Sequence, residues 1–229
     1  MTLNSIQLYE TQYQEMIQGK RPFFRTPPDA LVRAIFVESI FPAEGGARAL
    51  EFGCGEGRNV EFLVDLGYDV TATDVSAAAC DATAKRMGEK ADIRLLTPGD
   101  DLPFESEVFG LVVCWEVLHW LGSEELFVGC LNEFGRVLKK QARIVFTMPT
   151  ERHFLRFHAR EVGKSCYEVT ATSRQGCMLY APDVGTVKAL CEAAKLRIDR
   201  VMSYDYGDEK GEHTLASPFS MYVFIASNV

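Results

Sequence analysis

Short apolar runs alternate, over most of this chain, with segments whose apolar residues recur at the spacing of a helix. Such alternation predicts an α/β fold, with a mostly parallel sheet and helices on both faces. The run at 108–115 is continuously apolar, which favours a central strand that helices cover on both sides. The predicted strands cover 49–52, 69–73, 91–96, 108–115 and 143–147, and the helices between them cover 59–66, 76–87 and 124–138.

The two ends of the chain depart from this alternation. Residues 1–20 and 29–39 carry apolar residues at helical spacing, so we expect two helices before the first strand. Near the C-terminus two predicted strands, 196–204 and 220–227, follow each other without a helix, which indicates an antiparallel pair at one edge. We expect one domain over 1–229, made of a helical leader or flap at 1–46, a cofactor-binding core at 47–149, a substrate lid or solvated helix face at 150–181, and a C-terminal helix with edge strands at 182–229.

A glycine-rich loop follows the first predicted strand. Gly53, Gly55 and Gly57 stand at alternate positions, a helix follows them, and the next strand ends on Asp74. Glycines let the backbone turn sharply and approach a ligand closely. An acid about 20 residues beyond such a loop is placed to accept hydrogen bonds from ribose hydroxyls. The pattern indicates a nucleotide or nucleoside site, although an ordinary tight turn between a strand and a helix has the same glycines.

The residues around the loop argue against a dinucleotide. The dinucleotide fingerprint needs glycine at its sixth position, and Arg58 stands there. Glu51 ends the first strand, where a carboxylate would repel a pyrophosphate and attract a cationic group. Both features favour an adenosyl ligand with a cationic amino-acid tail.

The stretch LEFGCGEGRN resembles the first motif of class I S-adenosylmethionine-dependent methyltransferases, in particular their type 11 small-molecule branch and the tellurite-resistance methyltransferases. The resemblance implies a Rossmann-like, doubly wound sheet of seven strands in the order 3-2-1-4-5-7-6, with the last strand antiparallel. It implies S-adenosylmethionine as cofactor and S-adenosylhomocysteine as product. The implied cofactor-binding residues are Glu51, Gly53, Cys54, Gly55, Gly57, Asn59, Asp74, Val75, Asp100, Asp101, Leu102 and Trp115.

In this family the acid before the loop holds the methionine end and the acid after the second strand holds the ribose. An acid near a Leu-Pro-Phe segment contacts the adenine amino group. Asp100 and Asp101 both precede that segment here, and the shorter loop leaves open which of them has this role.

The methyl acceptor has weaker signals. His119, after the fourth strand, is either a general base, since an ordinary histidine pKa lies near 6.5, or a packing residue. In the family, aromatic and basic residues near the N-terminus and after the fifth strand often contact substrate. The candidate acceptor-binding residues are Tyr9, Tyr13, Arg25, His119, Trp120, His153 and Arg156.

Composition restricts the partners. A net charge of −8 and a sequence pI of about 5.1 argue against a broad nucleic-acid surface. Seven scattered cysteines without a Cys-x-x-Cys pair indicate reduced thiols, a cytoplasmic protein and no metal site. We find neither a signal-peptide core nor an apolar run of about 18 residues, so no membrane association is expected. The expected oligomeric state is a monomer or homodimer.

Three functions remain open at this point. The first is methyl transfer to a small soluble molecule by in-line displacement. The second is methyl transfer to RNA or protein, which the acidic composition and the Cys-Trp-Glu-Val sequence after the fourth strand disfavour. The third is a protein that binds S-adenosylmethionine without catalysis.

Overall fold

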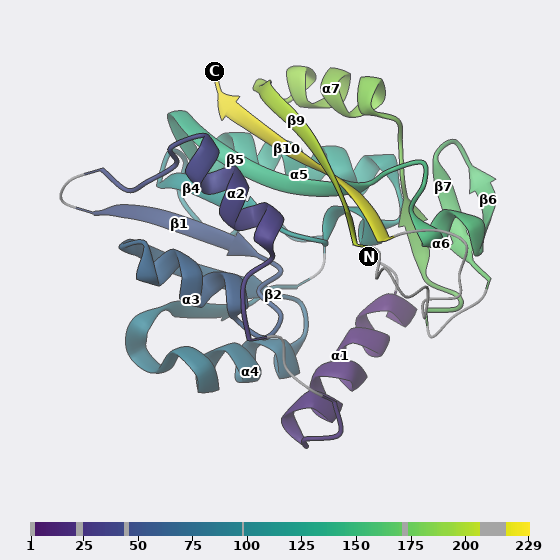
Figure 1. Ribbon diagram of the computed structural model, residues 1–229, viewed down its shortest axis with the longest axis horizontal. Helices are drawn as coiled ribbons and strands as arrows, with labels where there is room; N and C mark the ends of the chain where they lie inside the picture. The colour runs from purple at the N-terminus through teal and green to yellow at the C-terminus, as the bar shows by residue number, and fades with distance from the viewer. Residues whose placement is uncertain (1–2, 22–24, 44–45, 98, 171–173, 207–218) are drawn as a thin grey trace.

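The computed structural model describes residues 3–21, 25–43, 46–97, 99–170, 174–206 and 219–229 (Figure 1). The helices are α1 (Leu3–Ile17), α2 (Asp29–Val37), α3 (Arg58–Asp65), α4 (Ala77–Met87), α5 (Glu124–Val137), α6 (Phe154–Phe157) and α7 (Val184–Ala193), with short 3-10 turns η1 (Gly88–Lys90) and η2 (Leu118–Leu121). The strands are β1 (Ala47–Phe52), β2 (Tyr68–Asp74), β3 (Asp92–Leu95), β4 (Phe109–Cys114), β5 (Leu138–Pro149), β6 (Ala159–Gly163), β7 (Cys166–Val169), β8 (Met178–Tyr180), β9 (Leu196–Tyr206) and β10 (Phe219–Asn228).

The main sheet has seven strands in the order β3-β2-β1-β4-β5-β10-β9. Strands β1 to β5 pair in parallel, and β10 runs antiparallel to both β5 and β9. The predicted order, with the last strand inserted before the sixth, is therefore confirmed. Parallel strands present their carboxyl ends at one edge of the sheet, where ligands bind in open α/β folds.

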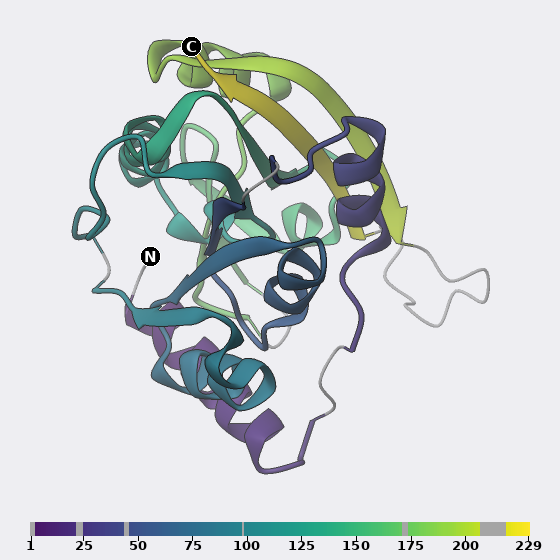
Figure 2. The same ribbon diagram turned by 90° about the vertical axis from the view of Figure 1, so that its left-hand side faces the viewer.

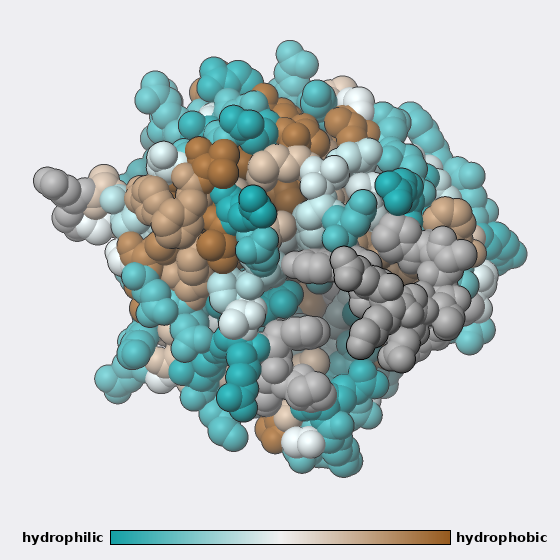
Figure 3. Space-filling view, in the orientation of Figure 1, coloured by the Kyte–Doolittle hydropathy of each residue, from teal (hydrophilic) through white to brown (hydrophobic). Residues whose placement is uncertain are grey.

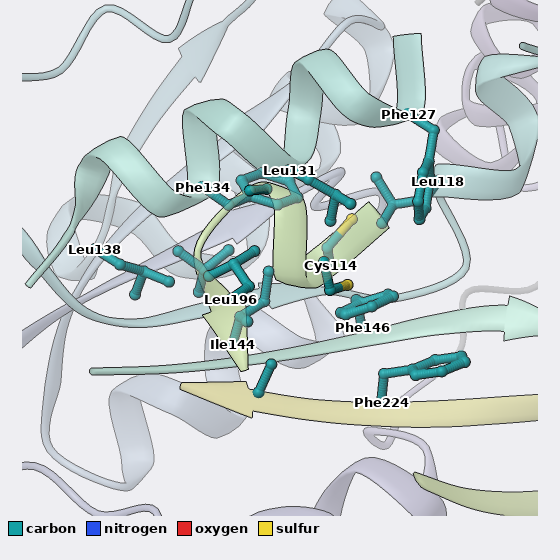
Figure 4. Packing of buried hydrophobic residues seen from close by; sticks show 14 of the residues in the cluster. Cys114, Leu118, Phe127, Leu131, Phe134, Leu138, Ile144, Phe146, Leu196 and Phe224 are labelled. Atoms are coloured by element: carbon teal, nitrogen blue, oxygen red, sulfur yellow. The ribbon is translucent and has the colours of Figure 1, made fainter. Parts of the chain in front are cut away.

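Helices cover both faces of this sheet, as predicted. On one face α5 and α7 lie over β4, β5 and β10; Figure 4 shows Phe127, Leu131 and Phe134 of α5 directed toward Cys114 and Phe146. On the other face α2 and α3 pack against the alternate side chains of the same strands. Leu50 and Ala49, neighbours in β1, belong to these two cores because successive strand residues point to opposite faces.

Strand β5 is longer than the predicted 143–147. It begins directly after α5 and ends at Pro149, which lies opposite Met221 of β10. Met148 and Pro149, which lie beyond the predicted end at residue 147, also belong to the strand. Proline is tolerated at the end of a strand because one missing N–H there costs little of the hydrogen-bond ladder.

The segment after β5 does not form the expected helix face. It contains the single-turn α6 and a separate antiparallel sheet in the order β6-β7-β8, beside the main sheet in Figure 1. The alternative of a solvated helix face at 150–181 does not hold, because Arg160 and Glu168 face each other across β6 and β7 at 2.6 Å, and the substrate lid stays a prediction. A small core that includes Trp120, Leu155 and Leu179 joins this sheet to η2. Long-range strand pairing of this kind leaves little trace in local periodicity.

Helix α1 stands outside the two helical layers, beside α4 in both Figure 1 and Figure 2. Its Glu10 carboxylate accepts hydrogen bonds from the Ser76 hydroxyl at 2.7 Å and from the Ala78 N–H at 3.2 Å. The contact fixes α1 at the start of α4, next to the carboxyl end of β2. Within the described ranges, none of the helices has both the length and the apolarity required to cross a membrane.

Candidate functional site

A cavity of about 1260 Å³ lies at the carboxyl ends of β1, β2 and β4. The glycine loop, the end of β2, the loop after β3, η2, α1 and the segment around α6 line it. In Figure 3 the surface is hollowed near the centre of the view, beside α1. Ligand pockets commonly measure about 300–1,000 Å³, so this cavity has room for two molecules side by side.

The glycine loop forms one wall, and its backbone requires glycine at two positions. Gly53 and Gly55 have φ angles of 85° and 56°, in the left-handed region. A Cβ on Gly53 would lie 2.2 Å from Cγ2 of Val117, and one on Gly55 would lie 2.6 Å from the Tyr13 hydroxyl. The loop is therefore held directly against η2 and α1, with no space for side chains.

Glu51, at the end of β1, is fully buried and is not itself among the residues that line the cavity, although its partner Asn59 is. Its Oε1 accepts a hydrogen bond from the Asn59 side-chain amide at 2.8 Å, while Oε2 has no partner. Burial raises the pKa of Glu51 to about 8, although the hydrogen bond from Asn59 and the charge of Arg58 oppose this. A cationic ligand group close to this carboxyl would ionise it and supply the missing partner.

Asp74 ends β2 and contacts the glycine loop. Its Oδ2 accepts from the Gly55 N–H and its Oδ1 from the Ser76 N–H, both at 3.0 Å. Burial raises the pKa of Asp74, although these two backbone hydrogen bonds partly lower it. An ionised carboxylate has about four lone-pair sites, so Asp74 retains capacity to accept from ligand hydroxyls. Val75, the next residue, also lines the cavity.

The thiol of Cys54 is buried within the loop, where it meets the Cys80 thiol and the Thr83 hydroxyl. Gly57 has a φ of 80° and precedes α3, but it lies outside the cavity lining and packs against Thr83. The structure thus brings Cys54 to the cavity wall and uses Gly57 to start a helix.

The loop after β3 closes another side of the cavity. Asp100 and Asp101 are exposed at its rim, and Leu102 is buried. The Leu102 N–H donates to Oε2 of Glu133 at 2.8 Å, and Arg136 donates to the Leu102 carbonyl at 2.9 Å. These two α5 residues, which the sequence analysis did not assign to the site, fix the loop.

Trp115 and Glu116 follow the central strand β4. The buried Trp115 indole stacks on Tyr204 and donates to Oε1 of Glu116 at 3.1 Å. Glu116 has a φ of 62°, a strained conformation for a residue with a side chain, and its N–H donates to the Thr147 hydroxyl at 2.7 Å. Burial raises the pKa of Glu116, against the charge of Arg58. The sequence analysis missed Glu116; its signal was an acid directly after the most apolar strand.

The part of the cavity farthest from β3 is mainly aromatic. We call it the inner chamber and define it by Tyr9, His119, Trp120, His153, Phe154, Arg174 and Phe219. Both histidines are buried, and Nδ1 of His119 and Nε2 of His153 have no hydrogen-bond partner. Burial, together with the neighbouring His153, holds the pKa of His119 well below its ordinary value. His119 is therefore neutral and a weaker base than an exposed histidine; its catalytic role stays a prediction.

Arg174 belongs to the inner chamber although it precedes β8 in the small sheet. Its guanidinium lies 5.0 Å from the ring centre of Tyr9 and 4.7 Å from that of Trp120, and it donates to the Tyr9 hydroxyl. These contacts join α1, η2 and the small sheet. Nothing near Arg174 in the sequence marked it, because its partners are distant along the chain.

Two predicted acceptor-binding residues lie away from the cavity. Arg25 is exposed, and its carbonyl accepts a hydrogen bond from Arg86 at 2.7 Å. Arg156 donates to the Ala181 carbonyl at 3.0 Å and to the Tyr167 hydroxyl at 2.8 Å, so it braces the small sheet. Tyr9, Tyr13, Trp120 and His153 do line the cavity. Across the part of the chain that the structure describes, no group of three or more His, Cys, Asp or Glu side chains is arranged to hold a metal ion.

Comparison with protein families identifies residues 50–146 as a methyltransferase domain. Nodulation protein S of Rhizobium tropici is 32% identical over 100 residues, which make up 44% of this chain. The matched part covers 42% of the length of that curated relative.

Solved structures show the same fold at low sequence identity. A methyltransferase from Methanosarcina mazei, described as S-adenosylmethionine-dependent, superposes with a TM-score of 0.69 and 17% identity, over 85% of this chain and 97% of the other. The 1,6-didemethyltoxoflavin-N1-methyltransferase of Burkholderia thailandensis, solved with 1,6-didemethyltoxoflavin and S-adenosylhomocysteine bound, superposes with a TM-score of 0.66 and 15% identity, over 97% and 88% of the two chains.

Proposed function

The chain carries a class I S-adenosylmethionine-dependent methyltransferase domain, and on that premise we propose that it transfers the sulfonium methyl group to a small-molecule acceptor by in-line displacement. The observation that carries this proposal is the division of one large cavity. Its outer half has the residues that suit the cofactor, and its inner chamber is a mainly aromatic space beside them.

The residues of the outer half fit S-adenosylmethionine. The unpartnered, buried Oε2 of Glu51 suits the cationic amino group of the methionine end. Glycine at positions 53 and 55 lets the loop backbone lie directly against Val117 and Tyr13 at the cavity wall, where a Cβ would clash with them. Asp74 has lone pairs for ribose hydroxyls, and Asp100, Asp101 and Leu102 line the cavity on the side of the loop after β3, which suits contacts with adenine. We propose these roles for them, with Asn59 orienting Glu51.

When bound, S-adenosylmethionine supplies an electrophilic methyl group on a positively charged sulfur, which is a good leaving group. The protein then has to align the acceptor and exclude water. Tyr9 and Tyr13 of α1 cover the cavity, and Trp115 and Trp120 form apolar walls behind the glycine loop. A base is needed only where the acceptor atom must lose a proton, and neutral His119 is the candidate for that step.

The composition of the inner chamber supports a small acceptor over RNA or protein. Its walls come from α1, η2, the segment around α6 and the start of β10, and their aromatic rings suit a compact apolar molecule. The net charge of −8 also works against an RNA surface. The Burkholderia enzyme, which has a small heteroaromatic compound bound, shares the fold and lends this proposal support.

The test begins with calorimetric titration of S-adenosylmethionine, S-adenosylhomocysteine and NAD. We expect the first two to bind and NAD not to bind. Asp74→Ala should weaken S-adenosylhomocysteine binding at least about tenfold, because hydrogen bonds to an ionised group contribute about 1.5–3 kcal/mol. Asp69→Ala, an exposed acid at the other end of β2, is the matched control and should leave the affinity unchanged.

Incubation with methyl-labelled S-adenosylmethionine then tests the acceptor class. The label should enter the small-molecule fraction of a cell extract and not its RNA or protein fraction. Binding of both adenosyl compounds without labelling of any fraction would contradict methyl transfer. It would favour a protein that binds S-adenosylmethionine without catalysis.

A further inference from the structure

His153 offers one hydrogen-bond donor to the inner chamber, and its local fold determines which nitrogen that is. The Leu155 N–H donates to Nδ1 of His153 at 3.2 Å, at the start of α6. Nδ1 is therefore an acceptor and carries no proton. Burial lowers the pKa of His153 to about 3, so the ring is neutral and its single proton resides on Nε2.

That Nε2–H has no partner among the residues that the structure describes. The His153 side chain is fully buried, between the rings of Phe154 at 4.9 Å and Phe219 at 4.8 Å. A buried donor without a partner costs free energy in the unliganded protein. A ligand acceptor atom that is pressed against His153 would remove this cost without breaking an existing hydrogen bond.

The charged groups at the chamber balance each other. Glu116 contributes a carboxyl group, and Arg174 contributes a guanidinium that already stacks on Tyr9 and Trp120. Arg174 and Arg58 both lie within the electrostatic reach of Glu116. Arg58 is itself paired with Glu56 at 3.8 Å, so two acids face two arginines. With both histidines neutral, a ligand with a net charge would lose its hydration shell and gain no excess of opposite charge.

The walls of the chamber select for shape. Trp120 and Tyr9 meet edge to face at 6.0 Å, and Phe154 and Phe219 stand beside His153 on another side. Aromatic rings pack well against such faces and edges. The remaining requirement is one acceptor atom at the rim of the ring, for the His153 donor.

We propose that the methyl acceptor is an uncharged, planar aromatic or heteroaromatic molecule that presents a carbonyl oxygen or ring nitrogen to Nε2–H of His153. This inference rests on the proposed function, which provides the neighbouring cofactor site. His153 acts here as a specificity residue, because it orients the acceptor and takes no part in bond making.

The test uses three probes with one ring system: naphthamide, which is uncharged, naphthoate, which is anionic, and naphthamidine, which is cationic. Each is titrated against protein saturated with S-adenosylhomocysteine, with binding followed by ligand-observed NMR. Naphthamide should bind at least about fivefold more tightly than either charged probe. S-adenosylhomocysteine binding is measured first. A protein that does not bind it would contradict the proposed function, whereas a protein that binds it but does not prefer naphthamide would contradict only the present inference.

Two substitutions separate the donor from the helix cap. In His153→Asn the amide oxygen takes the place of Nδ1 and the donor at Nε2 is lost; in His153→Gln the amide nitrogen reaches the place of Nε2. His153→Asn should weaken naphthamide binding about three- to tenfold, the range for one neutral hydrogen bond. His153→Gln should bind naphthamide with most of the wild-type affinity. His158→Asn, in the same segment but outside the cavity lining, is the control and should leave the naphthamide affinity unchanged.

Tighter binding of a charged probe would overturn the proposal, as would equal naphthamide affinity in the wild type and His153→Asn. If His153→Asn fails to fold, the order of affinities for the three probes in the wild-type protein still tests whether the acceptor is uncharged.

Discussion

Glu51 is a carboxyl group that this fold keeps protonated near neutral pH. Its pKa is raised to about 8 by burial, whereas an unfolded chain ionises it near 4.5. Between these values the unfolded chain has released the proton and the folded chain retains it. The free energy of unfolding therefore falls as pH rises through this window.

We expect Glu51→Gln to remove this dependence, because Gln keeps the hydrogen bond from Asn59 and does not titrate. Relative to the wild type, the variant should gain about 1 kcal/mol of stability per pH unit between pH 6.5 and 8. Urea unfolding of the unliganded protein at several pH values measures it. The buried histidines are present in both proteins, so their contribution cancels in the comparison of the two pH profiles. Parallel pH profiles of the two proteins would contradict the assignment.

The same residue determines the cofactor site that we propose. A ligand ammonium beside Oε2 lowers the pKa of Glu51, so part of the binding energy ionises the carboxyl at low pH. Glu116 and Arg174, unlike Glu51, could not be assigned to the site from the sequence. Their roles depend on neighbours from other elements, Tyr204, Tyr9 and Trp120, which no local pattern specifies.

At the scale of elements, helix α1 is held to the cofactor site through Glu10. Burial alone would raise the pKa of Glu10, but hydrogen bonds from Ser76 and Ala78 lower it overall, so the side chain is an anion at the start of α4. A negative group at a helix N-terminus is favourable. Because Ser76 also donates its N–H to Asp74, α1 and the proposed ribose-binding acid share one anchor.

Glu10→Ala should loosen α1 without unfolding the sheet. We expect faster hydrogen exchange of α1 amides and a loss of S-adenosylhomocysteine affinity of about two- to tenfold, since Tyr9 and Tyr13 would cover the cavity less often. Gln7→Ala, at an exposed position of the same helix, is the control. Unchanged exchange in α1 would show that the anchor is not Glu10.

At the scale of the whole molecule, the cavity joins parts of the chain that are far apart in sequence. α1, the end of β1, the segment after β4, the residue Arg174 before β8 and the start of β10 all contribute to its walls. A ligand that contacts all of them stabilises only the folded state, in which they are assembled.

Saturating S-adenosylhomocysteine should therefore raise the melting temperature. At about 100 times its dissociation constant the gain is about 2.7 kcal/mol, or roughly 5–10 °C for a chain of this size. Calorimetric or fluorescence melting measures the shift, with NAD at the same concentration as control. A shift of equal size with NAD would argue against an adenosylmethionine site.

The sequence alone determined the parts of this protein whose physics is local. A strand, a glycine loop, a helix and a second strand follow from apolar periodicity and from positions that need glycine, and they place Glu51 and Asp74. The strand order, which the structure confirms, was implied by the resemblance to the methyltransferases. Tertiary structure decided the rest. The small sheet, the strained Glu116 and the Arg174 contacts depend on pairing, burial and hydrogen bonds between segments distant in sequence. Apolar periodicity does not reveal such contacts, because the two partners lie in different parts of the chain and neither has a distinctive local pattern.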